Sequence, residues 1–281
     1  MQYGLSTHLF RHERLSSHIL DQILAAGFRT VELFAERGHV DYHDSNHVRD
    51  LAQWFQDHAV ALHSVHAPLS SDPEGGRQGG LAVSVAHLER RWRIDSMDEI
   101  KRALEMAERL PFRYLILHLG LEGEEYDLRK FDAAFTSIEH LRIFATERGV
   151  RLLLENTPNQ LSTPERLIEF LAYTRLDDVR VCFDTGHAHL SPGVSAAFAT
   201  LQSRVASTHV HDNHGEKDEH LLPFDGSIDW APACRDFRAA SSGQDSYPIL
   251  FELRADGHEQ AVNVLPRLSE VKERMEHLND E

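Results

Sequence analysis

Short runs of apolar and β-branched residues alternate with longer stretches of helical periodicity along the chain. The short runs predict eight strands, over residues 3–10, 30–35, 61–69, 114–120, 151–157, 179–187, 205–212 and 248–254. In the stretches between them, apolar residues recur at the three- and four-residue spacing of an amphipathic helix. Strict alternation predicts parallel strands joined by crossover helices. Eight such units in 281 residues indicate an α/β fold with a single (β/α)8 barrel, which forms one domain over residues 1–281.

Two of the helical stretches carry recognisable start signals. Residues 96–110 open with Ser96 and have Glu99 three positions later, which predicts a capping box. Residues 163–173 begin with Thr163, whose hydroxyl is expected to cap the first turn. Both helices are therefore expected to start at a side-chain cap.

The longest irregular segment covers residues 69–94 and follows the third predicted strand. A barrel would place such a segment over its functional face, where it would act as a lid. Four arginines lie in it, at Arg77, Arg90, Arg91 and Arg93. Guanidinium groups match phosphate oxygens, but a solvated surface or a contact with a second subunit explains these arginines better.

Charge and composition narrow the classes of partner. The formal net charge of −16 argues against general binding to nucleic acid or to anionic membranes. Two cysteines are too few for a disulfide framework, and the chain has neither a signal-peptide pattern nor a membrane-spanning apolar run. We therefore expect a cytoplasmic protein with a small-molecule partner, and a homo-oligomer stays open.

Histidine, aspartate or glutamate ends seven consecutive predicted strands. These residues are Glu32, His66, His118, Glu155, Asp184, His209 and Glu252; His187 and His211 lie close behind two of them, and Asp218 and His220 follow the seventh strand. A single residue of this kind is often structural; Asp184, for example, could cap the next helix. Carboxylates that converge at one end of a barrel repel one another, and cations neutralise them. Mixed histidine and carboxylate ligands suit zinc, manganese or iron better than magnesium or calcium.

Seven motifs together resemble one known family. They are HAP (66–68), HLG (118–120), LLLENTP (152–158), CFDTGHAH (182–189), THVHDN (208–213), KDEHLLPFDGSIDW (217–230) and FEL (251–253). The set resembles the xylose isomerase-like TIM-barrel superfamily, which includes sugar isomerases, sugar epimerases and endonuclease IV. The resemblance covers nearly the whole chain and is specific for the superfamily rather than for one reaction.

The resemblance also implies a metal-ligand set. In the sugar epimerases of this superfamily one divalent ion, often Mn2+, has four protein ligands, which correspond to Glu155, Asp184, His209 and Glu252. In endonuclease IV these four belong to a cluster of up to three Zn2+ ions. The further ligands of that cluster correspond to His66, His118, His187, Asp218 and His220. The resemblance therefore implies one to three ions.

The first functional hypothesis is sugar or sugar-phosphate isomerisation or epimerisation. The ion would polarise the carbonyl of an open-chain sugar, and Glu155 and Glu252 would move protons through a metal-bound enediolate. Glu32, His8 and His211 are expected to bind sugar hydroxyls.

Three alternatives remain. An endonuclease IV-like zinc phosphodiesterase that acts on abasic DNA agrees with the nine ligands but not with the net charge or with the long segment after HAP. A sugar lyase or hydratase would use the same site. A non-catalytic binding barrel has less need of two opposed glutamates.

Overall fold

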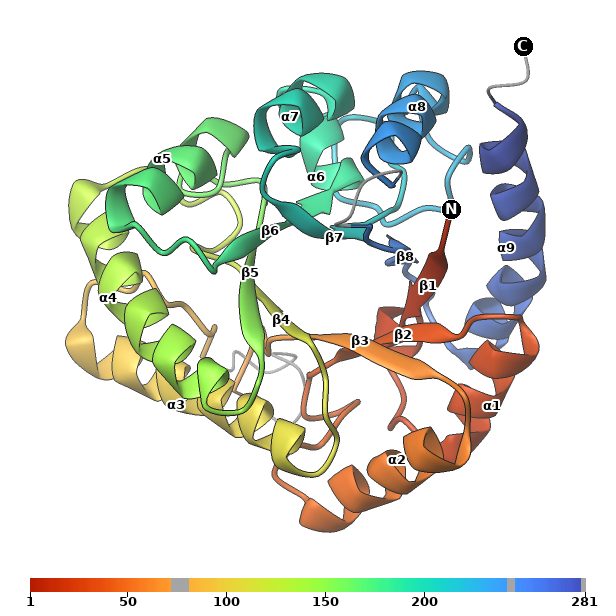
Figure 1. The fold of residues 1–281 in the computed structure, drawn as a ribbon, viewed down its shortest axis with the longest axis horizontal. Helices are drawn as coiled ribbons and strands as arrows, with labels where there is room; N and C mark the ends of the chain where they lie inside the picture. The colour runs from red at the N-terminus through yellow and green to blue at the C-terminus, as the bar shows by residue number, and fades with distance from the viewer. Residues whose placement is uncertain (72–80, 242–245, 279–281) are drawn as a thin grey trace.

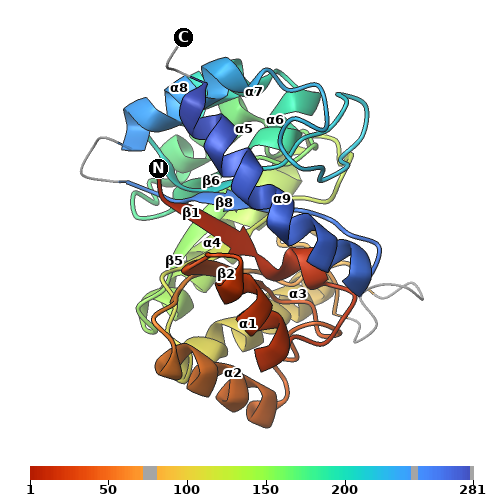
Figure 2. The same cartoon turned by 90° about the vertical axis from the view of Figure 1, so that its right-hand side faces the viewer.

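The chain folds into a barrel of eight parallel strands surrounded by helices. A computed structural model describes residues 1–71, 81–241 and 246–278. The strands form one sheet in the order β7-β6-β5-β4-β3-β2-β1-β8. A parallel bridge between Val210 and Phe251 joins the last two strands and brings the ring together. Figure 1 looks down this ring, with the helices outside it, and Figure 2 shows it from the side. The predicted (β/α)8 barrel is confirmed.

The elements have the following bounds. The strands are β1 (Tyr3–Ser6), β2 (Thr30–Phe34), β3 (Ala61–His66), β4 (Tyr114–Leu117), β5 (Arg151–Glu155), β6 (Arg180–Asp184), β7 (Val205–His209) and β8 (Ile249–Phe251). The α-helices are α1 (Ser17–Ala25), α2 (Ser45–Asp57), α3 (Arg90–Glu105), α4 (Leu128–Thr146), α5 (Pro164–Thr174), α6 (Thr185–Leu190), α7 (Val194–Leu201), α8 (Trp230–Ser241) and α9 (His258–His277). Two short 3-10 helices are η1 (Thr7–Phe10) and η2 (Met106–Glu108).

All eight predicted strands are present, and each ends earlier than predicted. The apolar pattern of residues 3–10 continues into η1, and that of residues 179–187 continues into α6. The second change has a clear cause, because Asp184 Oδ1 accepts a hydrogen bond from the backbone nitrogen of His187 and caps α6. The chain therefore turns away from the sheet at the residues expected to carry the chemistry.

One of the two predicted helix caps is wrong. Helix α3 starts at Arg90, so Ser96 and Glu99 lie inside it. Ser96 Oγ accepts a hydrogen bond from the backbone of Ser84, and Glu99 Oε1 accepts one from the Tyr42 hydroxyl. These side chains join the helix to its neighbours instead of capping it. The cap at Thr163 is confirmed, because its hydroxyl accepts a hydrogen bond from Arg166 N.

The core follows from the alternation of the pattern. Apolar strand residues that face outward pack against the inner faces of the helices; β2, for example, is buried along its whole length. A smaller cluster of Tyr114, Ile116, Leu153 and Cys182 comes from three adjacent strands, β4, β5 and β6. Among the described residues, no helix is both long and apolar enough to cross a membrane.

The long segment is described only in part. Residues 72–80, which include Arg77, lie outside the described residues. The two stems pair through Ser70 and Ala82, and the carboxylate of Glu36 accepts hydrogen bonds from the backbone of Leu69 and Ser70. The stems therefore have a defined anchor at the carboxyl end of β2.

Candidate metal centre

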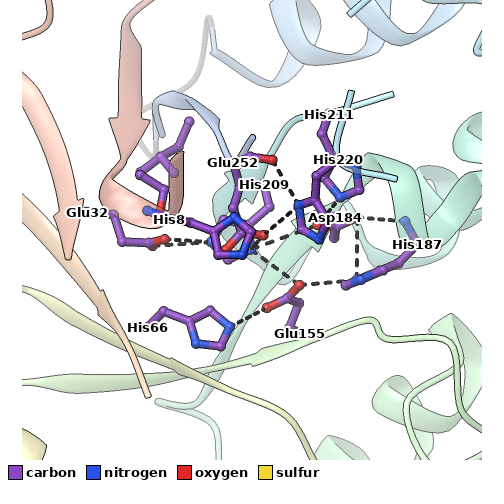
Figure 3. A network of polar contacts seen from close by, with 12 residues as sticks. His8, Glu32, His66, Glu155, Asp184, His187, His209, His211, His220 and Glu252 are labelled. Carbon is purple, nitrogen blue, oxygen red and sulfur yellow. Dashed lines mark hydrogen bonds and ion pairs between the residues drawn. The ribbon is translucent and has the colours of Figure 1, made fainter. Parts of the chain in front are cut away.

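The carboxyl ends of the strands bring all nine predicted ligands together. Together with His211 they form three groups in which the ligand atoms lie within 4.8 Å of one another: His66, His118 and Glu155; Glu155, Asp184, His209 and Glu252; and His187, His211, Asp218 and His220. Glu155 belongs to two of the groups and would therefore serve as a ligand in both. Figure 3 labels eight of these residues and shows their side chains gathered around Glu155 and His209: His66, Glu155, Asp184, His187, His209, His211, His220 and Glu252.

Asn156 fixes the distance between the two central carboxylates. Its side-chain amide donates to the backbone oxygen of Asp184 at 2.9 Å and accepts from the backbone nitrogen of Asp184 at 2.8 Å. These two hydrogen bonds tie the end of β5, immediately after Glu155, to the end of β6. The spacing of the two carboxylates is thus constrained by hydrogen bonds between the Asn156 side chain and the Asp184 backbone.

Three imidazoles are oriented by backbone carbonyls. His66 Nδ1 donates to Ala67 O at 2.7 Å, His187 Nδ1 to Asn156 O at 2.9 Å, and His220 Nδ1 to Glu252 O at 3.0 Å. A donated Nδ1–H leaves Nε2 with its lone pair in the neutral ring. These hydrogen bonds select the tautomer that a metal ligand needs.

The lone pairs so produced face carboxylate oxygens. His220 Nε2 lies 2.8 Å from Asp218 Oδ2, and His66 Nε2 lies 3.4 Å from Glu155 Oε2. Two lone pairs repel at such distances unless a proton or a metal ion lies between them. Several further buried atoms have no hydrogen-bond partner among the described residues: Glu155 Oε1, His209 Nδ1, His211 Nδ1 and Asp218 Oδ1. Unpaired buried polar atoms are costly, so this donor set fits divalent cations.

The electrostatics of the site point the same way. Burial by itself would raise the pKa of Glu155, but the charges of His209 and His118 hold it well below its usual range. Burial would lower the pKa of His66, but the Glu155 carboxylate raises it to about 9. The pKa of His187 is likewise raised well above its usual range, against the effect of burial, by Asp184. In the metal-free protein, protons on the imidazoles therefore compensate the carboxylates.

Glu32 lies beneath the ligand groups, whereas it was expected to bind a sugar hydroxyl. Its carboxylate is fully buried, accepts from Ser64 Oγ at 2.6 Å and bonds His209 Nε2 at 3.1 Å. This contact turns His209 Nδ1 toward the site, 3.3 Å from Glu155 Oε1 and 3.5 Å from Glu252 Oε2. The geometry favours a role for Glu32 in orienting His209 over contact with a sugar hydroxyl.

His211 also lies elsewhere than expected. It was predicted to bind substrate, but its fully buried ring bonds Asp184 Oδ2 through Nε2 at 3.1 Å and falls within the third ligand group. A Cβ on Gly186 would lie 1.9 Å from the His211 ring. The glycine of the CFDTGHAH motif is thus required for close approach of this imidazole to α6.

A cavity of about 240 Å3 opens above the three groups. Its lining includes His8, His66, His118, Glu155, His187, Asp218, His220 and Glu252, together with Leu69 and Val83 from the stems of the long segment. Asp184, His209, His211 and Glu32 are not among the lining residues. Of the three residues predicted to bind sugar hydroxyls, only His8 has access to the cavity.

Asp212 is a residue whose importance the sequence did not reveal. Its buried carboxylate accepts hydrogen bonds from Asn213 N, Phe224 N, Ile228 N and Trp230 Nε1. It thereby organises the loop from β7 to α8, which carries Asp218 and His220. The signal available was its place in the THVHDN motif, between a predicted ligand and the loop.

His189 and the described arginines of the long segment lie outside the cavity. His189 bonds Ser227 Oγ through Nε2 at 2.9 Å and joins α6 to the β7–α8 loop. Arg90, Arg91 and Arg93 do not line the cavity, and Arg93 donates to the backbone oxygen of His87. The described part of the long segment therefore places no arginine at the site.

Comparison with known sequences identifies the family that this geometry resembles. Residues 20–281 match the family model described as xylose isomerase-like TIM barrel. The chain is 28% identical over 243 residues to the uncharacterized protein y4fM of Sinorhizobium fredii; the match covers 80% of this chain and 77% of that protein. This relative has no assigned activity of its own.

Solved structures with the same fold include several enzymes. A D-tagatose 3-epimerase-like protein has a TM-score of 0.78 and 23% identity, with 99% of both chains covered. The IolI protein with a bound zinc atom has a TM-score of 0.73 and 16% identity, with 99% of this chain and 97% of that chain covered. The probable 3-DHS dehydratase AsbF of Bacillus anthracis has a TM-score of 0.71 and 15% identity, with 97% and 98% covered.

Proposed function

Because the chain belongs to the xylose isomerase-like TIM-barrel family, we propose that it is a divalent-metal-dependent enzyme that isomerises or epimerises a sugar. Glu155 and Glu252 would be its proton-transferring residues. The likeness to an epimerase-like protein and to a zinc-binding protein of the same fold supports this class of chemistry.

One observation carries the proposal. Of the four residues in the central ligand group, only Glu155 and Glu252 also line the cavity, whereas Asp184 and His209 do not. A group that only holds a metal has no need to face substrate. Two carboxylates that do both are placed to take a proton from a substrate carbon and to return it.

The metal would be held by Glu155, Asp184, His209 and Glu252. When bound, a zinc or manganese ion supplies Lewis acidity that polarises a carbonyl oxygen. The other two ligand groups provide for further ions, with Glu155 shared between the first and the central group.

The two glutamates would divide the proton transfer between them. One carboxylate takes the proton from the carbon next to the carbonyl, which leaves an enediolate of the sugar. The other carboxylic acid returns a proton, to the opposite face of the same carbon in an epimerisation or to the neighbouring carbon in an isomerisation. His8 faces the same cavity; its Nδ1–H donates to Leu253 O, and its Nε2 accepts a hydrogen bond from Arg11 Nη1.

A panel of open-chain aldoses and ketoses tests the proposal. Protein loaded separately with Mn2+ and with Zn2+ is expected to convert at least one sugar, and chelation followed by reloading should abolish and restore the activity. A fully loaded protein that converts no sugar in the panel would contradict the proposal. Metal content must be measured for each sample, so that poor loading is not mistaken for inactivity.

Incision of a DNA duplex with an abasic site tests the second candidate function. The complete set of nine ligands favours this candidate, whereas the net charge of −16 and a cavity of about 240 Å3 oppose it. Nicking that requires metal and is lost in a Glu155→Gln variant would assign the chain to DNA repair. We expect no nicking.

Elimination of water or another group is the third candidate, and the likeness of fold to a probable dehydratase favours it. The proton abstraction would be shared with the isomerase, and the outcome would differ in the departure of a leaving group. Product analysis of the same sugar panel, extended to hydroxy-ketoacids, separates the two.

A further inference from the structure

The cavity above the candidate metal centre has two cationic side chains in its lining, Arg11 and Arg254. Arg11 directly follows η1 at the end of β1, and Arg254 lies two residues after Glu252 at the end of β8. Strands β1 and β8 are hydrogen-bonded neighbours in the sheet. Both guanidinium groups therefore come from adjacent loops on the same end of the barrel.

Arg11 is held in place by a relay through a buried histidine. Its Nη1 donates to His8 Nε2 at 3.2 Å, and His8 Nδ1 donates to Leu253 O at 2.8 Å. His8 is 3% exposed and packs edge-on against Phe34. This relay joins the β1 loop to the residue before Arg254, so the positions of the two arginines are coupled through the backbone of β8.

Arg254 is exposed at the rim of the cavity. Its Nη1 lies 3.4 Å from the backbone oxygen of Asp218, and no carboxylate in the described part of the chain lies within ion-pair distance of it. The nearby carboxylate of Asp218 is occupied by imidazoles, 2.8 Å from His220 Nε2 and 3.5 Å from His187 Nε2. The charge of Arg254 is thus available to a ligand.

Arg11 and Arg254 lie among acidic residues in the cavity lining. Apart from the histidines, four other residues with ionisable side chains line the cavity, and all four are acidic: Glu122, Glu155, Asp218 and Glu252. The chain as a whole carries a net charge of −16. An anionic group remote from the metal centre would be repelled by this negative surface unless a local cation compensated it. The two arginines are the only lysine or arginine side chains among the described lining residues.

We propose that Arg11 and Arg254 form a subsite for an anionic group of the substrate, a phosphate or a carboxylate. This group would lie at the end of the open-chain sugar remote from the carbonyl that faces Glu155 and Glu252. Guanidinium groups bind both anions through paired, charge-assisted hydrogen bonds. The inference rests on the proposed sugar chemistry and narrows its substrate to acidic or phosphorylated sugars.

Calorimetry with inert analogues tests the subsite without turnover. The ligands are D-arabinitol, D-arabinonate and D-arabinitol 5-phosphate, titrated into metal-loaded protein. We expect at least one of the two anions to bind about 10- to 100-fold more tightly than neutral D-arabinitol, because one or more hydrogen bonds to a charged group contribute about that much affinity. The stronger of the two anions identifies the natural group.

The variants Arg11→Met and Arg254→Met, singly and together, should reduce that preference, and the double variant should abolish it. Arg29→Met is the matched control, because Arg29 is exposed at the amino end of β2, on the opposite end of the barrel. It removes the same charge and should leave the preference unchanged. Melting temperature and metal content confirm that each variant is folded and loaded.

Three results would overturn the subsite: equal binding of neutral and anionic ligands, no binding of any of the three, or a preference that survives in the double variant because the anion binds the metal. The proposed reaction fails separately. If the arginine-dependent preference is found but no acidic or neutral sugar is converted, the subsite stands and the reaction is wrong. If D-arabinitol binds and the arginine variants change nothing, only the subsite is wrong.

Discussion

Two histidines of strand β3, three residues apart, show how the two ends of this barrel differ. His63, toward the amino end, bonds Ser207 Oγ at 3.2 Å and packs against Tyr114, and burial lowers its pKa to about 4. For His66, at the carboxyl end, burial acts in the same direction, but Glu155 raises the pKa to about 9. The same residue type on one strand thus has opposite pKa shifts.

The opposite pKa shifts come from the residues that surround each histidine. Below the site, the apolar cluster of Tyr114, Ile116, Leu153 and Cys182 offers no ionised partner. At the carboxyl end, buried carboxylates from β5, β6 and β8 converge, and each is paired with imidazoles. Burial therefore does not make the site; the convergence of carboxylates on one end does, and the following predictions test that distinction.

The largest effect is expected from the two glutamates that line the cavity. Glu155→Gln and Glu252→Gln each keep the shape of the side chain but remove the proton-transferring group, so sugar turnover should fall by about 10²- to 10⁴-fold. Glu125→Gln is the matched control, since Glu125 is exposed in the β4–α4 loop and does not line the cavity. A loss below tenfold in both glutamate variants, measured with metal content restored, would remove them from the chemistry.

Substitution of the buried carboxylate beneath His209 should have the next largest effect. Glu32→Gln weakens the acceptor that orients His209 Nδ1 toward the site, so metal affinity should fall by about 10- to 100-fold. Metal titration by competition with a chromophoric chelator measures it. If Glu32 instead binds substrate, the variant will raise KM at saturating metal and leave metal affinity unchanged.

A direct comparison of the two histidines should show a smaller effect. His66→Asn removes a predicted ligand and should weaken binding at its group by roughly tenfold or remove one ion, as counted by elemental analysis. His63→Asn changes a ring of the same strand that has no carboxylate partner, and it should leave the metal content unchanged. Equal losses in the two variants would mean that packing in β3, and not ligation, controls the metal.

The smallest expected effect concerns pH. In the metal-free protein the raised pKa of His66 contributes stability that is present below about pH 6.5 and lost as pH rises through about 9. Protons also compete with the metal for the imidazoles. The increase in melting temperature on adding metal should therefore be larger at pH 8 than at pH 6, by about 2–4 °C for each kcal/mol. A metal-induced increase in melting temperature that is smaller at pH 8 than at pH 6 would contradict the assignment of the imidazoles as metal ligands.

The sequence allowed the fold and most of the site to be predicted because both depend on local patterns. Alternation of strands and helices predicts parallel strands, whose carboxyl ends lie at one end of a barrel, and this places Glu155, Asp184, His209 and Glu252 together. The same pattern named His66, His118, His187, Asp218 and His220, and the resemblance to a known family implied that all nine residues are metal ligands. The cap at Thr163 was predicted correctly because it depends on neighbouring residues alone.

The contributions that the sequence did not reveal depend on contacts between distant segments. Glu32 belongs to β2 but orients His209 on β7, and Asp212 organises a loop that extends to Trp230. Ser96 and Glu99 have the spacing of a capping box, yet contacts with Ser84 and Tyr42 use their side chains and the helix starts at Arg90. Arg11 and Arg254 lie at opposite ends of the chain, and only closure of the barrel places them in one cavity.

Incorporation of solvent deuterium into a converted sugar is the most direct test of the central claim. The metal-loaded enzyme, incubated in D2O with a sugar that it converts, is expected to place one deuterium on the carbon next to the carbonyl. The Glu155→Gln and Glu252→Gln variants should lose this exchange together with turnover. Conversion of the sugar with no deuterium in the product would contradict proton transfer by the two glutamates and indicate a direct hydride shift between carbons.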